Sequence, residues 1–229
     1  MPYNYMPVSV SLTDRRCLVV GGGKVALRKI ETLLDYGSAV TVVAPEVEDK
    51  IQYFGDSGRI RLEKREYCSP EAGNYRLVIS ACDDLAVNRR VSDDCRRSGT
   101  LVNVVDQPSL CDFIFPAVVR RDCLSAAIST DGKAPFMSGH LRMILEDVFP
   151  AHWTRLMPLA ARFRKMVQER WPDDMHQKTV CYSQFLEADW KSLLKERNPT
   201  AVDGELERML EPRADKLEGV PSIDEPADS

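Results

Sequence analysis

The fold of this chain is decided by residues 17–26, which read Cys-Leu-Val-Val-Gly-Gly-Gly-Lys-Val-Ala. The apolar run Cys17–Val20 predicts a buried strand, and the three glycines after it permit a tight turn. A helix is predicted next, because apolar residues recur at helical spacing up to Gly37, which is suited to end it. A second, β-branched run at 40–43 completes a strand–helix–strand unit, and such a unit implies a parallel sheet.

The alternation of strands and helices continues along the next part of the chain. At 60–67 apolar and charged residues alternate, as on an exposed or edge strand, whereas 77–81 and 101–105 read as buried strands. A helix is predicted at 88–97. The expected fold class is therefore α/β, with a Rossmann-type doubly wound parallel sheet.

The character of the sequence changes after Asp106. Two strands are predicted at 118–119 and 124–129, and helical periodicity begins at Pro135. The apolar residues expected on one side of that helix are Met137, Leu141, Ile144, Leu145 and Val148.

An α-helical C-terminal domain is expected to follow. It consists of a helix at 151–170, kinked or split by Pro158, and a third helix at 183–196. The stretch from residue 197 is rich in Glu, Asp and Pro, and it predicts a flexible tail with at most a short helix around Leu206–Leu210.

Composition excludes several classes of function. Basic and acidic residues number 31 and 35, and the net charge of −4 argues against a general nucleic-acid binder. No apolar run is long enough to span a membrane, and residues 1–7 do not resemble a signal peptide. The seven cysteines are widely spaced without a CxxC pair, so we expect reduced thiols in a cytoplasmic protein and no metal site.

The glycine turn matches the pattern G-x-G-x-x-G/A of dinucleotide sites. Gly21 permits the turn out of the strand, Gly23 lets the backbone approach a pyrophosphate, and Ala26 is small enough for close helix packing. The N-terminus of the helix offers free N–H groups and a positive dipole end to phosphates. A merely structural turn is the alternative, but the motif stands between a strand and a helix, as a dinucleotide site requires.

The residue after the second strand bears on the choice between NAD and NADP. An acidic residue about 20 positions after the motif binds the ribose hydroxyl in NAD sites. Glu46 stands there, and no arginine in that turn would neutralise a 2′-phosphate. NAD is therefore favoured, although Glu46 would also suit a solvated turn.

Polar residues follow the last two predicted strands of the sheet. Asp106 is expected at the nicotinamide end of the cleft, where a carboxylate can accept a proton, or else as a cap of the next turn. Cys82 is expected as spacer or cofactor wall, and Asp83 and Asp84 as caps of the following helix. The histidines, His140, His152 and His176, are not spaced as metal ligands.

Together these segments resemble one family, the precorrin-2 dehydrogenases of the siroheme-synthase N-terminal type. The resemblance covers roughly residues 5–170. The matching segments are Gly-Gly-Gly-Lys-Val-Ala-Leu-Arg-Lys at 21–29, Val-Thr-Val-Val-Ala-Pro-Glu at 40–46, Asn-Val-Val-Asp at 103–106, Phe-Ile-Phe-Pro at 113–116 and Ala-Ile-Ser-Thr-Asp-Gly-Lys-Ala-Pro at 127–135.

The resemblance implies NAD-dependent oxidation of precorrin-2, a tetrapyrrole, to sirohydrochlorin by a homodimer. It assigns the key carboxylate to Asp106. It assigns cofactor contacts to Lys24, Val25, Pro45 and Glu46. With the three glycines of the motif and the loop after the strand at 77–81, the candidate cofactor residues are Gly21, Gly22, Gly23, Lys24, Val25, Pro45, Glu46, Cys82 and Asp83. The expected domains are an NAD-binding domain at 1–115, a dimerisation and substrate segment at 116–150, a helical domain at 151–196 and the flexible tail at 197–229.

A polycarboxylate substrate also needs hydroxyl groups and cations around it. Ser129 and Thr130 match a hydroxyl pair of the family, and the candidate cations on the substrate side include Lys133, His140 and Arg142, with Arg120 and Arg121 nearby in sequence. Two residues depart from the family pattern: Cys82 stands where Thr is usual, and Asp131 where Gly is more familiar.

Two alternatives remain open from the sequence. Some members of the family also insert ferrous iron into sirohydrochlorin, and Asp106 would serve that reaction too, with only a transient metal. A non-catalytic NAD-sensing regulator is the alternative of another class, although the sequence has no basic recognition helix.

Overall fold

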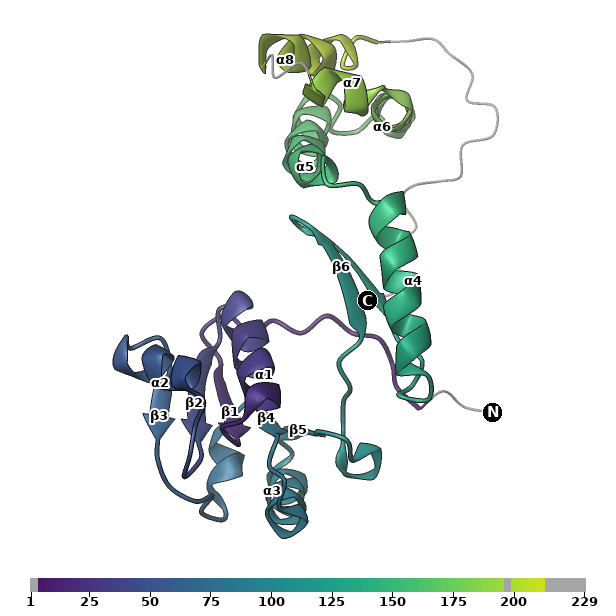
Figure 1. The fold of residues 1–229 in the computed structure, drawn as a ribbon. Coiled ribbons are helices and arrows are strands. Elements are labelled where there is room, and N and C mark those ends of the chain that lie inside the picture. Colours follow the sequence, from purple (N-terminus) through teal and green to yellow (C-terminus); the bar gives the residue numbers. More distant parts are fainter. Residues whose placement is uncertain (1–3, 196–198, 213–229) are drawn as a thin grey trace. The chain divides into compact units, whose positions relative to one another are not determined.

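The structure, a computed structural model, describes residues 4–195 and 199–212 and divides the chain into two compact units (Figure 1). The first, which we call the sheet unit, comprises Met1–Phe115 and Ser129–Ala134. The second, the helical unit, comprises Pro116–Ile128 and Pro135–Ser229. Each unit is described by itself.

A five-stranded parallel sheet with the order β3-β2-β1-β4-β5 forms the centre of the sheet unit (Figure 1). This order confirms the predicted doubly wound α/β fold, with the predicted edge strand β3 at one side. The strands are β1 (Arg16–Val20), β2 (Ala39–Val43), β3 (Arg61–Glu63), β4 (Leu77–Ser80) and β5 (Leu101–Val104).

Alternate residues of the strands build two cores, one on each face of the sheet. Cys17 and Val19 of β1 pack on the face covered by α1 (Lys24–Asp35) and α2 (Asp49–Asp56). Leu18 and Val20 pack on the opposite face with α3 (Leu85–Ser98). The strands read as continuous apolar runs because both faces are buried. The helix α2 was not among the predicted elements.

The register of the sheet brings the loops after four strands to one edge. Val20 of β1 pairs with Val43 of β2 and with Ser80 of β4, and Ser80 pairs with Val104 of β5. The chain reverses its winding direction at β1, which has β2 on one side and β4 on the other. Ligands of open α/β sheets bind at this kind of switch point, outside the carboxyl ends of the strands.

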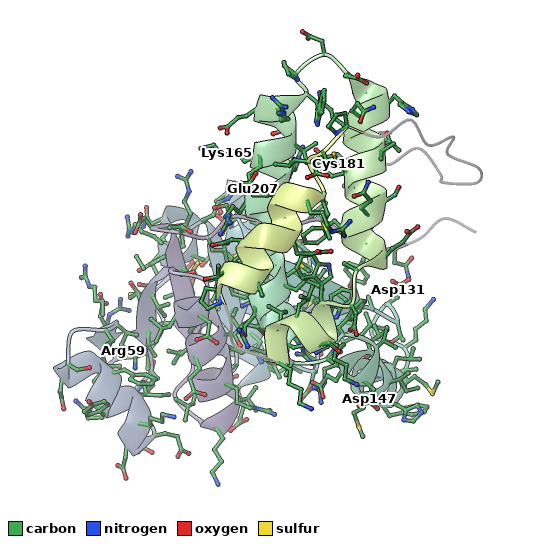
Figure 2. All side chains as sticks on the ribbon, turned by 90° about the horizontal axis from the view of Figure 1, so that it is seen from above. Arg59, Asp131, Asp147, Lys165, Cys181 and Glu207 are labelled. Carbon is green, nitrogen blue, oxygen red and sulfur yellow. The ribbon has the colours of Figure 1, made fainter. Side chains whose placement is uncertain are left out.

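In its described residues, the helical unit contains the antiparallel pair β6 (Ala117–Arg121) and β7 (Leu124–Ile128), and five helices. The helices are α4 (Pro135–Val148), α5 (Trp153–Arg170), α6 (Met175–Glu187), α7 (Trp190–Lys195) and α8 (Pro199–Arg208). Their core contains the stacked rings of Phe163 and Phe185 and the fully buried Cys181, which Figure 2 labels. None of the described helices is long and apolar enough to cross a bilayer.

Two predictions for the helical unit were wrong. α5 is continuous through Pro158, so the prediction that this proline splits the helix is wrong, whereas the predicted kink stays a prediction; Leu156 and Phe163 on either side of Pro158 are buried in one core. The helix predicted at 183–196 is in fact divided between the end of α6 and α7, with a break at Ala188–Asp189. α6 ends at Glu187 with the extended residue Ala188, and Asp189 caps the start of α7 by accepting a hydrogen bond from the Ser192 N–H (3.1 Å).

The predicted flexible tail is also wrong where the structure describes it. α8 occupies 199–208, and Val202, Leu206 and Met209 are buried in the helical core. These three side chains recur at helical spacing and form an apolar stripe. The prediction of a flexible tail considered only the acidic composition of the segment and missed this stripe. The part of the predicted tail at 213–229 lies outside the described residues.

Candidate active site

The glycine turn is packed tightly between the ends of two neighbouring strands. Gly21 has a φ of +123°, and a Cβ built on it would lie 2.3 Å from the carbonyl oxygen of Ala81. A Cβ on Gly22 would lie 2.0 Å from the carbonyl oxygen of Glu46. Any larger residue at either position would therefore force the loops apart. The sequence predicted glycine at 21 for the tight turn, which its positive φ confirms, but neither close contact was predicted, because both neighbours are distant in sequence.

Gly23 differs from both, because nothing lies within 4 Å of a Cβ built on it. Its φ of −85° and ψ of −173° suit any residue, so neither packing nor backbone strain requires glycine there. Gly23 is the N-cap of α1, and no side chain caps this helix end. Free N–H groups and open space beside them fit the pyrophosphate of a dinucleotide.

The loop after β2 forms a second wall of the same site. The N–H of Glu48 donates to the carbonyl of Gly22 (2.9 Å), which fixes this loop against the glycine turn. Pro45 and Glu46 are exposed next to it. The Glu46 carboxylate is therefore free in this structure to accept hydrogen bonds from ribose hydroxyls.

The loop after β4 forms a third wall. Asn88 accepts from the Ser80 hydroxyl (2.6 Å) and donates to the carbonyl of Cys82 (2.8 Å), which holds the loop in place. Asp84 caps α3 by accepting from the Ala86 N–H (2.7 Å), as the sequence predicted. Asp83 is exposed.

These walls enclose a cleft of about 860 Å³. All nine predicted cofactor residues line it, and Ala44, Val47, Glu48, Asp49 and Ala81 complete the lining. The cleft therefore brings together residues from three loops that are separate in sequence. Their contacts with a cofactor remain predictions.

Asp106 lies at the same edge of the sheet, just after β5. Asp106 has a φ of +58°. The residues on either side of it form backbone hydrogen bonds: the Val105 N–H donates to the carbonyl of Ser80 (2.9 Å), and the Gln107 N–H donates to the carbonyl of Val104 (3.2 Å). The short helix that follows, at Pro108–Leu110, has Gln107 as its N-cap and no side-chain cap. The structure thus gives no support to the capping role, and the carboxylate of Asp106 is exposed.

The loop Ser129–Ala134 belongs to the sheet unit. The hydroxyl of Thr130 accepts from the Ala134 N–H (3.2 Å), and that of Ser129 accepts from the Asp131 N–H (3.2 Å). Each hydroxyl keeps its own proton for a further acceptor. Asp131 has a φ of +52°, which explains why glycine is the more familiar residue there, and Lys133 is exposed.

The remaining predicted substrate residues lie in the helical unit. His140 is exposed on α4, and Arg142 forms an ion pair with Glu146 one helical turn later. Arg121 donates to the carbonyl oxygens of Phe149 (2.6 Å) and Glu146 (3.3 Å) and so holds β6 against the end of α4. The contact of these residues with a substrate remains a prediction.

The sheet order, the uncapped helix and the cleft define a Rossmann-type dinucleotide-binding protein. In agreement, residues 8–117 match the protein family described as "Putative NAD(P)-binding". The match confirms the prediction that this part of the chain binds a nicotinamide dinucleotide.

The chain is homologous to the siroheme synthases. It is 44% identical to the siroheme synthase of Methylococcus capsulatus over 170 residues, which are 74% of this chain and 36% of that one. It is 38% identical to the siroheme synthase of Pseudomonas paraeruginosa over 210 residues, 92% of this chain and 44% of that one. The chain thus spans less than half the length of these relatives.

A solved structure of similar length also matches. SirC, a precorrin-2 dehydrogenase, superposes with a TM-score of 0.72 and 27% identity, over 90% of this chain and 98% of SirC. Together with the siroheme synthases, this match confirms the family resemblance that the sequence motifs indicated.

Proposed function

We propose that this chain oxidises precorrin-2 to sirohydrochlorin with NAD as the hydride acceptor. The observation that carries the proposal is the shared sheet edge: the uncapped N-terminus of α1, suited to a pyrophosphate, follows β1, and the exposed carboxylate of Asp106 follows β5 at the same end of the sheet, outside the lining of the cleft. The likeness to SirC and to siroheme synthases supports a tetrapyrrole as the substrate.

The reaction removes a hydride and a proton from the reduced macrocycle. NAD, held by the glycine turn and the loop after β2, would supply the hydride acceptor. Asp106 accepts the proton and releases it to solvent, because an exposed carboxylate can lose the proton again before the next turnover. The products are sirohydrochlorin, NADH and one proton, so atoms and electrons balance.

The preference for NAD over NADP rests on the loop after β2. Glu46 is exposed at the rim of the cleft, and Glu48 and Asp49 also line it. Three carboxylates would repel a 2′-phosphate, whereas Glu46 can accept hydrogen bonds from both ribose hydroxyls.

A homodimer is part of the proposal. Helix α4 leaves a row of apolar side chains exposed at helical spacing: Met137, Leu141, Ile144 and Val148, which are 40%, 38%, 47% and 56% exposed. Contiguous apolar surface of this kind is typical of protein interfaces. A second copy of α4 is the occupant that this apolar row favours, since identical stripes are self-complementary about a two-fold axis.

The proposal includes the compartment of the protein. All seven cysteines are free thiols, in keeping with a reducing compartment such as the cytoplasm.

The proposal also leaves room for a second reaction, the insertion of ferrous iron into sirohydrochlorin. In that reaction ferrous iron would be a substrate that contacts Asp106 transiently and not a permanently bound metal.

The experiment is to supply authentic precorrin-2 with either NAD or NADP and to follow sirohydrochlorin by its absorbance. We expect rapid formation with NAD and slower formation with NADP. A folded protein that leaves precorrin-2 unchanged with both cofactors would refute the proposal. A further incubation with sirohydrochlorin and ferrous iron, without NAD and against a control without protein, decides on iron insertion.

A further inference from the structure

Lys29 is an unusual residue on the second turn of α1. Lys29 is three residues after Ala26 and four residues before Leu33, so the three side chains lie on the same face of the helix. Ala26 and Leu33 are buried against the sheet. A lysine on such a face must bury part of its side chain. The sequence alone singled out the glycines before it and gave Lys29 no role.

The ammonium group of Lys29 lies over the ring of Phe115, 3.8 Å from its centroid. That ring packs edge-on against Phe113, at 5.4 Å between centroids. The segment is tied to β5, because Asn103 donates to the carbonyl of Phe113 (3.0 Å) and the N–H of Asp112 donates to that of Val102 (2.8 Å). The phenylalanine ring that supports the Lys29 cation is thus fixed to β5, the strand that Asp106 follows.

The charge of Lys29 is not neutralised in the described part of the chain. No carboxylate there lies within 4.0 Å of its nitrogen, whereas the exposed Lys50 pairs with Glu31 at 2.6 Å. Burial lowers the pKa of Lys29, the charge of Arg28 lowers it further, and the carboxylate of Asp106 acts in the opposite direction. A half-buried cation near Asp106 therefore retains the capacity to bind an anion.

We infer that Lys29 binds a carboxylate of the substrate and thereby places the reacting edge of the macrocycle at Asp106. The inference rests on the proposed function, because it takes the substrate to be a polycarboxylate tetrapyrrole. Phe115 holds the ammonium in position by a cation–π contact, and its ring adds an apolar surface on which a planar ligand can lie. Lys29 is on this account a substrate-binding residue of the sheet unit.

The test is a titration of sirohydrochlorin, followed by absorbance, onto wild type, Lys29→Met and Lys29→Arg. Methionine keeps the apolar contact with Phe115 but has no charge. We expect Lys29→Met to weaken tetrapyrrole binding about tenfold or more, since an ion-paired hydrogen bond is lost. NAD affinity should be unchanged, and arginine should retain most of the binding. Lys50→Met is the matched control and should bind like wild type.

Three outcomes separate the possible failures. If Lys29→Met binds sirohydrochlorin as tightly as wild type, the inference is wrong and the proposed function stands. If the variant loses NAD and tetrapyrrole affinity in parallel, with a lower unfolding temperature, Lys29 is structural and the inference is also wrong. If wild type neither binds sirohydrochlorin nor forms it, the proposed function itself fails. Lys29→Gln serves in the same titration should the methionine variant not fold.

Discussion

At the scale of single residues, the three glycines of the turn have different reasons to be glycine. Gly21 and Gly22 are required by the protein itself, because a Cβ on either would collide with a backbone oxygen. Gly23 has no such neighbour. No described residue requires glycine at position 23, whereas a pyrophosphate bound at the N-terminus of α1 would require a small residue there.

We therefore expect Gly23→Ala and Gly21→Ala to behave differently. Gly23→Ala should leave the free energy of unfolding within about 0.5 kcal/mol of wild type but weaken NAD binding tenfold or more. Gly21→Ala should destabilise the fold, since its φ is positive and its Cβ has no room. Denaturant unfolding and calorimetric titration with NAD measure the two effects. Equal loss of stability in both variants would contradict the distinction.

Asp106 permits a similarly clean substitution. Asparagine tolerates its left-handed backbone and has nearly the same shape, but it cannot accept a proton as a carboxylate does. Asp106→Asn should lower the rate of NADH formation roughly 100-fold or more, with NAD affinity unchanged. Asp14→Asn is the control, because Asp14 has the same φ of 58° but precedes β1 at the other end of the strand. Full turnover by Asp106→Asn would exclude the carboxylate from the reaction.

At the scale of elements, a buried carboxylate ties the chain before β4 to α3. Asp94 is 2% exposed and accepts from the hydroxyls of Tyr67 (2.7 Å) and Ser69 (2.9 Å), and it also pairs with Arg97. Burial alone would raise the pKa of Asp94, but these three donors outweigh it and hold the pKa below its ordinary value. The ionised carboxylate is therefore favoured in the folded state.

The stabilisation by Asp94 should depend on pH in one direction. A folded pKa below the unfolded value of about 3.9 means that the stabilisation is complete above the unfolded pKa and is lost as pH falls through the folded one. Asp94→Asn should lower the free energy of unfolding by about 1–3 kcal/mol at neutral pH and by less in acid. The exposed neighbour Asp93 supplies the control, Asp93→Asn. The measurement is urea unfolding of wild type and Asp94→Asn from neutral pH to acid. A difference in the free energy of unfolding that stays the same at every pH would contradict the role of the ionised Asp94.

The apolar row on α4 gives a prediction about assembly. Ile144→Glu places a charge in the middle of Met137, Leu141 and Val148 and should shift a dimer to monomers in sedimentation experiments. Lys165→Glu also adds negative charge, but on α5, where Lys165 is exposed outside this row (Figure 2). The Lys165→Glu variant should sediment with the same oligomeric mass as wild type. A wild-type monomer, or an unchanged Ile144→Glu dimer, would contradict the assignment of this surface.

At the scale of the whole molecule, the parts that the sequence predicted are those with local causes. The strands around Cys17–Val20, the glycine turn and α1 follow from neighbouring residues, and all nine cofactor candidates line one cleft because strand ends meet at one edge. The features that it missed depend on distant partners. Gly22 meets Glu46, Pro158 is held by the helical core, and Lys29 meets Phe115. No pattern within a short window of sequence contains those contacts.

The central claim is that this chain transfers a hydride from precorrin-2 to NAD. The direct measurement is an anaerobic reaction of the wild-type chain with both compounds, in which NADH and sirohydrochlorin are quantified together against a sample without protein. We predict one NADH for each sirohydrochlorin formed. Sirohydrochlorin without NADH, or NAD bound by folded protein with neither product formed, would contradict the account.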